Sequence, residues 1–184
     1  RDKMSKQWMI YGAYGYSGEL TARKAKARGL SPVLAGRRED KLKPLADELG
    51  LEFRVFGLDN SAEITAALQD IAVVTHCAGP FSATAEPMMK ACIQAKTHYA
   101  DITGEIEVFE LAAKLDGLAK AAGIVLCPGV GFDVIPTDCV AAALKDALPD
   151  ATELTLGFDS RSGFSPGTAK TSVEGMAQGN KVRV

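Results

Sequence analysis

Apolar residues along this chain fall into short strand-like runs that alternate with segments of helical periodicity. The runs predict six strands, at about residues 9–11, 33–36, 52–56, 72–78, 98–101 and 124–127. The other segments predict six helices, at about residues 17–28, 39–49, 61–68, 85–95, 106–122 and 136–148. Regular alternation with short links is typical of an α/β fold with a doubly wound parallel sheet and right-handed crossovers.

The last part of the chain has a different pattern. Residues 153–158 alternate like a strand, residues 159–167 are typical of a loop, and residues 168–179 have a pattern that suits a helix. We therefore expect a Rossmann-type domain over residues 4–150. Residues 151–184 would then begin an α+β second domain, for substrate or dimerisation, of which this chain holds only the start.

A glycine-rich loop lies between the first predicted strand and the first predicted helix. Gly12, Gly15 and Gly18 have G-x-x-G-x-x-G spacing, with Ser17 just before the last glycine. Gly12 would allow a tight turn, Gly15 a close approach of backbone N–H groups to a pyrophosphate, and Gly18 tight packing of the helix on the sheet. The helix start would then face the anion with its N–H groups. A strand-to-helix turn without any ligand remains the alternative, because tight turns use glycine anyway.

The second predicted strand ends roughly 20 residues after the loop, where a dinucleotide-binding fold places the residue that reads the adenine ribose. An acid at that position would bind the ribose hydroxyls of NAD, but this chain has Gly36 followed by Arg37 and Arg38. A small residue followed by arginines leaves room for a 2′-phosphate and offers it donors. Asp59 follows the third strand, at an edge where ligand-binding residues collect. The pattern favours NADP over NAD, with a solvated basic turn as the alternative.

Composition limits the remaining classes of function. The chain has 184 residues, a formal net charge of −2 and 47% hydrophobic residues, which suits a globular domain with a sizeable core. Near-neutral charge argues against nucleic acid as the main partner, and no apolar run approaches the ~20 residues that span a bilayer. The four cysteines lack C-x-x-C spacing, so we expect no metal site and a reducing, cytoplasmic setting.

Candidate catalytic residues follow the later strands, where an α/β cleft opens. Asp101, Glu105 and Asp133 could donate or accept a proton beside a hydride-transfer cofactor, although each could instead cap a helix or turn. We expect His76 to be a hydrogen-bonded core residue and Cys127 to be a small buried side chain. No tyrosine is followed four residues later by lysine, so the acid/base pair of short-chain dehydrogenases is absent.

Five segments together resemble the saccharopine dehydrogenase-like oxidoreductases, a family that includes the trans-acting enoyl reductases. They are G-A-Y-G-Y-S-G at 12–18, L-A-G-R at 34–37, C-A-G-P-F at 77–81, H-Y-A-D-I-T-G-E at 98–105 and G-F-D-V-I-P-T-D at 131–138. Val134 replaces the hydroxyl residue usual in the last of these. The resemblance implies an NAD(P)-binding Rossmann domain and a following α+β domain that completes the substrate cleft.

The resemblance also implies roles for single residues. Arg37 would meet the adenine ribose phosphate. The pyrophosphate would be held by Gly12, Ala13, Tyr14, Gly15, Tyr16, Ser17 and Gly18, and the nicotinamide ribose side would be lined by Cys77, Ala78, Gly79 and Pro80.

The resulting hypothesis is an NADP-dependent oxidoreductase that acts on a small-molecule or lipid-linked substrate. A homodimer is compatible with the resemblance. Because the second domain is incomplete, we expect this chain by itself to bind cofactor weakly and not to turn over. The alternative is a non-catalytic NAD(P)-binding sensor or scaffold module.

Overall fold

Six short strands pair in parallel into one sheet at the centre of the molecule. In the computed structural model, which describes residues 7–157, no strand exceeds six residues. The strands are β1 (Gln7–Tyr11), β2 (Val33–Gly36), β3 (Phe53–Val55), β4 (Ile71–His76), β5 (His98–Asp101) and β6 (Leu126–Cys127). Their order across the sheet is β3-β2-β1-β4-β5-β6, and every pair is parallel.

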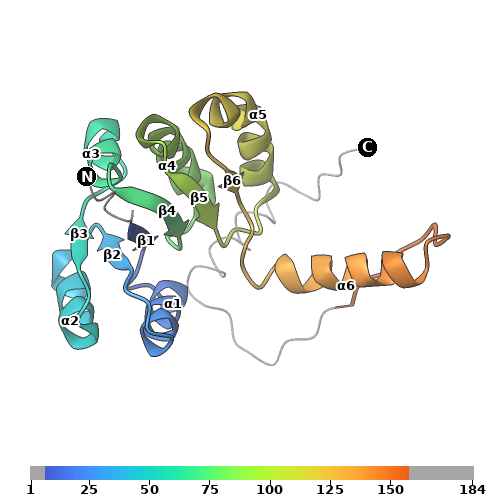
Figure 1. The fold of residues 1–184 in the computed structure, drawn as a ribbon, viewed down its shortest axis with the longest axis horizontal. Coiled ribbons are helices and arrows are strands. Elements are labelled where there is room, and N and C mark those ends of the chain that lie inside the picture. The colour runs from blue at the N-terminus through green and yellow to red at the C-terminus, as the bar shows by residue number, and fades with distance from the viewer. Residues whose placement is uncertain (1–6, 158–184) are drawn as a thin grey trace, which may run out of the picture.

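Helices connect the strands and cover both faces of the sheet. They are α1 (Tyr16–Ala27), α2 (Glu39–Leu49), α3 (Ser61–Ala67), α4 (Phe81–Ala95), α5 (Ile106–Ala122) and α6 (Ile135–Ala147). Figure 1 shows α1 and α2 on one face and α3, α4 and α5 on the other. The predicted doubly wound, Rossmann-type sheet is therefore confirmed.

The strand order changes direction between β1 and β4. From β1 the chain winds outward through β2 and β3, then returns to place β4 on the other side of β1. Open α/β sheets bind ligands at the carboxyl edge of such a switch point. The glycine loop follows β1, so the fold brings it to this edge.

Two apolar clusters hold the helices on the sheet. The larger contains 22 buried residues, among them Met88, Met89 and Tyr99, and it includes side chains of α3, α4 and α5. The smaller contains 7 buried residues, including Ile10 and Leu42, and it includes side chains of α1 and α2. Most of the buried core residues among residues 7–157 therefore belong to the cluster on the α3–α5 face.

Local signals placed most helix ends correctly. The side-chain oxygen of Asn60 accepts hydrogen bonds from Ala62 N (3.1 Å) and Glu63 N (3.3 Å), so it caps α3 as its sequence spacing predicts. Gly50 and Gly123 end α2 and α5 in the left-handed conformation. The predicted start of α4 at residue 85 is wrong, because the helix begins at Phe81.

Three other details also differ from prediction. On α5 the sequence spacing predicts an apolar stripe of Leu111, Leu115, Leu118 and Ala122. Leu115 is buried as predicted, but Leu118 is exposed, and Val108, Ala112 and Ala119 are buried as well. The last strand comprises only Leu126 and Cys127, whereas the sequence predicts a strand over residues 124–127; Ile124 N donates to Ala119 O (3.0 Å) and Val125 N to the ring nitrogen Nδ1 of His98 (3.0 Å). Cys127 is exposed rather than buried.

The end of the described chain leaves the sheet. None of the residues of α6 is buried, and Figure 1 shows this helix directed away from the strands. Residues 151–157 are exposed and form no strand, so the part of the strand predicted over 153–158 that can be assessed is wrong. The helix predicted over 168–179 lies outside the described residues. Within residues 7–157, none of the helices has the length and apolar character that a membrane span needs.

Candidate nucleotide site at the sheet edge

The glycine loop is shaped by contacts that leave no room for side chains at two of its glycines. Gly12 has a φ of +80°, and a Cβ atom there would lie 2.8 Å from Ala78 Cβ. A Cβ at Gly18 would lie 2.2 Å from Gly12 O, so the first turn of α1 packs directly on the loop backbone. The loop, the helix and the chain after β4 therefore form one tightly packed unit.

Gly15 is less crowded than the other two glycines. A Cβ there would meet only Gly12 O, at 3.2 Å. No side chain caps α1, and its backbone bonding to the loop begins with Glu19 N donating to Gly15 O (2.8 Å). The N–H groups of Tyr16 and Ser17 thus have no partner within residues 7–157, as expected at a helix start. Such a start, open and free of side-chain bulk, fits a phosphate group.

The chain after β2 carries the residues predicted to read the adenine ribose. Arg37 is exposed and forms no ion pair or hydrogen bond with any residue from 7 to 157. Arg38 is instead engaged by Asp40, with Nη2 2.6 Å and Nε 3.1 Å from its carboxylate oxygens. Asp59 is exposed on the chain after β3. Of the two arginines, only Arg37 is therefore available to a ligand without breaking a contact.

Tyr14 has a position that sequence reasoning did not foresee. A Cβ atom at Gly36 would lie 2.6 Å from Tyr14 Cε1, so the tyrosine ring covers the end of β2. The same ring packs against the smaller apolar cluster. Tyr14 follows β1 and Gly36 ends β2, so no short-range sequence pattern predicts that these two residues are in contact.

The segment after β4 forms the other wall of the switch point. Cys77 N donates to Tyr11 O (2.8 Å), and Ala78 packs against Gly12, so this segment lies directly beside the glycine loop. The peptide bond between Gly79 and Pro80 is cis. Burial raises the pKa of Cys77 to about 12, so its sulfur is a thiol at neutral pH.

Asp101 is buried at the end of β5 and fully engaged. Its carboxylate accepts hydrogen bonds from Tyr99 OH (2.5 Å), Thr103 N (3.0 Å) and Gly129 N (2.9 Å). Burial raises its pKa, while these donors act in the opposite direction. In this structure Asp101 therefore ties the loop after β5 to the loop after β6.

Glu105 reaches the start of a helix far from it in sequence. Its carboxylate oxygens accept hydrogen bonds from Phe81 N (3.1 Å) and Ser82 N (2.6 Å), the first two N–H groups of α4. This contact explains why α4 begins at Phe81 without a local capping residue. Asp133 is exposed, and its carboxylate lies close to Gly104, at 3.5 Å from the place of a Cβ there.

The structure thus brings the predicted residues of the glycine loop, of segment 77–80 and of the β5 and β6 ends to one edge of the sheet. The roles of Asp101, Glu105 and Asp133 in catalysis stay predictions. Among residues 7–157 there is no group of three side chains suited to a metal ion.

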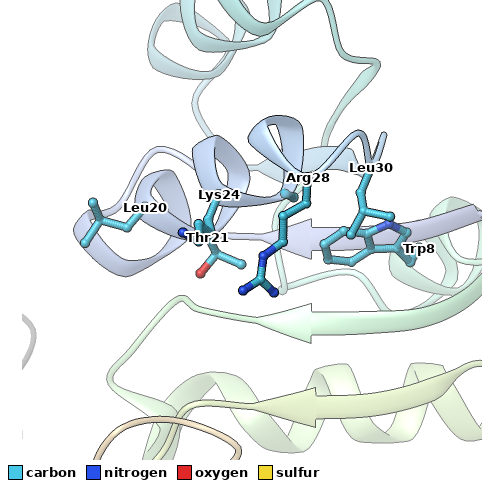
Figure 2. Close-up of a pocket in the computed structure, with 7 residues that line it drawn as sticks. Trp8, Leu20, Thr21, Lys24, Arg28 and Leu30 are labelled. Atoms are coloured by element: carbon cyan, nitrogen blue, oxygen red, sulfur yellow. The ribbon is translucent and has the colours of Figure 1, made fainter.

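A separate groove runs along α1 away from the loop. It has a volume of about 350 Å³ and is lined by Trp8, Leu20, Thr21, Lys24, Ala25, Arg28 and Leu30. Figure 2 shows Leu20, Thr21 and Lys24 along α1, with Arg28, Leu30 and Trp8 of β1 toward the other end of the groove. None of them belongs to the glycine loop, so the groove is not part of the candidate phosphate site.

A family model described as the saccharopine dehydrogenase NADP binding domain matches residues 8–127, from β1 to the end of β6. The chain belongs to this family. The match covers the sheet except Gln7, and it includes the candidate site residues described above apart from Gly129 and Asp133.

Similar proteins of known sequence agree with this assignment. The chain is 32% identical over 180 residues to a putative trans-acting enoyl reductase of Mycobacterium tuberculosis, which covers 90% of this chain and 43% of that protein. It is 29% identical over 152 residues to a saccharopine dehydrogenase-like oxidoreductase of Bos taurus, which covers 71% of this chain and 35% of that protein. The chain therefore spans less than half the length of these relatives.

Solved structures show the same fold. The apo saccharopine dehydrogenase (L-Glu forming) of Saccharomyces cerevisiae superposes with a TM-score of 0.67 at 18% identity, over 78% of this chain and 31% of that one. GenD2 from gentamicin A biosynthesis, in complex with NAD, superposes with a TM-score of 0.55 at 21% identity, over 78% of this chain and 39% of that one. At these identities the likeness concerns the fold alone.

Proposed function

We propose that this chain forms the NADP-binding part of an oxidoreductase, with the dinucleotide across the switch point between β1 and β4. The observation that carries the proposal is the start of α1 at this edge, where the N–H groups of Tyr16 and Ser17, beside Gly15, have no hydrogen-bond partner among residues 7–157. Membership of a family described as an NADP-binding domain supports it. The cofactor supplies the hydride chemistry; the protein supplies binding and orientation.

The preference for NADP over NAD rests on Gly36 and Arg37. No acid occupies the end of β2 to bind a ribose 2′-hydroxyl, and Arg37 extends into solvent with no partner in the described chain. A guanidinium group binds phosphate oxygens strongly because its donors are charged and arranged in a fork. The 2′-phosphate of NADP is the group that would engage it.

The substrate is proposed to be a small-molecule or lipid-linked compound. Relatives of this chain are named trans-acting enoyl reductase and saccharopine dehydrogenase-like oxidoreductase, and the proposal covers both kinds of substrate. Asp133 is the best candidate among the predicted carboxylates for proton transfer, because Asp101 and Glu105 are used by the backbone N–H groups that they bind. The proposed setting is the cytoplasm.

Fluorescence titration with NADPH and NADH tests the proposal. We expect Arg37→Ala to weaken NADPH binding by roughly 10- to 150-fold, equivalent to the ~1.5–3 kcal/mol of a charged hydrogen bond, and to leave NADH binding unchanged. Arg28→Ala is the matched control, since Arg28 is exposed on the far end of the α1 segment. We expect Gly15→Val to abolish binding of both nucleotides, because its side chain would fill the space beside the N–H groups.

Equal affinities of the wild-type chain for NADPH and NADH would remove the case for Arg37. Retention of NADPH by Gly15→Val would refute the site itself. Tight binding by a longer form of the protein, without turnover of a broad substrate panel, would instead favour a sensor or scaffold module. If turnover is found, Asp133→Asn should lower kcat without changing NADPH affinity.

A further inference from the structure

The backbone conformation at position 36 does not require glycine. The glycines with positive φ in the described chain are Gly12, Gly29, Gly50, Gly123 and Gly129, so Gly36 has a backbone conformation open to other residues. It lies at the end of a buried strand, where glycine is a poor choice by propensity. Some contact other than backbone strain must therefore account for it.

That contact is the ring of Tyr14. A Cβ atom at position 36 would lie 2.6, 3.2 and 3.4 Å from Tyr14 Cε1, Cδ1 and Cζ. The first distance is far inside the normal separation of two carbon atoms, which is about 3.5–4.0 Å. Any side chain at position 36 would thus have to displace the ring.

The ring is not free to move away without loss. Tyr14 is half-buried and packs against the apolar cluster that contains Ala13 and Leu34, so displacement would expose apolar surface of the α1–α2 face. The backbone on both sides of Tyr14 is also held by hydrogen bonds. Ala13 N donates to Ala35 O (3.1 Å), and Gly15 N donates to Gly12 O (3.0 Å). The glycine loop is thereby bonded to β2 immediately beside Tyr14.

We propose that Tyr14 acts on cofactor specificity through position 36: its ring occupies the space that a side chain there would need, so the end of β2 at the adenosine side of the dinucleotide is restricted to glycine and cannot carry an acid. An acid near this place in the fold binds the ribose hydroxyls of NAD and would repel a 2′-phosphate. With the ring in place, the end of β2 presents no carboxylate, and Arg37 is the charged group that remains. The inference rests on the proposed function and extends it to a residue of the glycine loop.

The structure makes the effect of an introduced acid depend on Tyr14. With Gly36→Asp alone, the carboxylate must compete with the ring for the same space, so NADPH affinity should fall at least tenfold without a gain in NADH affinity. In Tyr14→Ala/Gly36→Asp the space is free, and NADH affinity should rise at least tenfold above that of the single Gly36→Asp variant. Tyr14→Ala alone should not create NADH binding, because it supplies no acid.

The test is a double-mutant cycle on the 184-residue chain, with fluorescence titration of NADPH and NADH for all four forms. Gly117→Asp is the matched control for an added carboxylate, because a Cβ at Gly117 meets nothing within 4 Å. Thermal unfolding of Gly36→Ala, with and without Tyr14→Ala, measures the steric conflict without nucleotide. We expect Gly36→Ala to lower the Tm less when Tyr14 is already alanine.

The outcomes separate the two proposals. If the wild-type chain binds neither nucleotide, the proposed function fails and the specificity role falls with it. If the wild-type chain prefers NADPH but Gly36→Asp alone gains NADH affinity as fully as the double variant, only the role of Tyr14 is overturned. Strict additivity of the two substitutions in both the binding and the Tm measurements would overturn it equally.

Discussion

Acidification should destabilise this protein through His76. The side chain has no exposed surface, and rings of Tyr11, Phe81 and Tyr99 surround it with centroid distances of 5.4, 5.3 and 6.1 Å. Its Nε2 lies 3.0 Å from Thr84 Oγ1, while Nδ1 has no hydrogen-bond partner among the described residues. Thr84 donates its proton to a backbone carbonyl, either Ala78 O or Pro80 O, so the histidine Nε2–H is the donor to Thr84. The ring is therefore neutral, with its bare nitrogen in an apolar site.

The magnitude follows from linkage. Burial lowers the pKa of His76 from 6.5 to about 3, so between these values the unfolded chain takes up a proton that the folded chain does not bind. Stability then falls as pH falls, by about 1.4 kcal/mol per unit well below pH 6.5. From pH 7 to pH 5 the expected loss is about 2 kcal/mol, a large part of the ~5–15 kcal/mol of a typical domain.

Urea unfolding at several pH values between 7 and 5 measures this loss. His76→Phe keeps an aromatic ring but removes the titrating group, and the exposed His98 is present in both forms, so the difference between their pH slopes isolates His76. We expect the wild type to lose about 2 kcal/mol more than His76→Phe over this range. Parallel pH profiles for the two proteins would refute the account of a neutral, buried imidazole.

Two further predictions concern the packing of the site. Gly18→Ala should destabilise the fold by several kcal/mol, as overpacking of a core does, because its Cβ would lie 2.2 Å from Gly12 O. Gly117→Ala, at an open position within α5, should stabilise the fold by roughly 0.5–1 kcal/mol. Chemical denaturation of both variants and the wild type measures these changes. Glu105→Ala should cost about 1–2 kcal/mol by exposing Phe81 N and Ser82 N, with a smaller loss in Glu105→Gln. Equal stability of Glu105→Ala and the wild type would contradict the capping role.

Sequence reasoning located the elements whose signals are local. Apolar runs identified all six strands, and Asn60, Gly50 and Gly123 marked helix ends through contacts within a few residues. The start of α4 was missed because its capping group, Glu105, lies 24 residues from Phe81 and meets it only in the folded protein. A strand was expected from residue 153 because side chains alternate there, but alternation forms a strand only where a neighbouring strand accepts the hydrogen bonds.

In the candidate site, too, local features could be predicted from the sequence and long-range contacts could not. Glycine spacing and the arginine after Gly36 could be recognised along the chain, since each concerns one strand-to-helix connection. The approach of Ala78 to Gly12 and of Tyr14 to Gly36 could not, because each joins segments that meet only through strand order. From the sequence, Asp101 could serve in catalysis or cap a turn or helix, and only its three hydrogen-bond donors show how its carboxylate is used here.

The unequal division of buried side chains between the two faces of the sheet has a consequence for dynamics. Segments with little buried apolar surface open at lower free energy, and within residues 7–157 the face with α1 and α2 has the smaller cluster. Amide hydrogens of these two helices should therefore exchange with solvent sooner than those of α4 and α5. A dinucleotide bound at the start of α1 would slow that exchange. Binding would therefore be detected as slower amide exchange throughout α1 and α2, not only in the residues that contact the ligand.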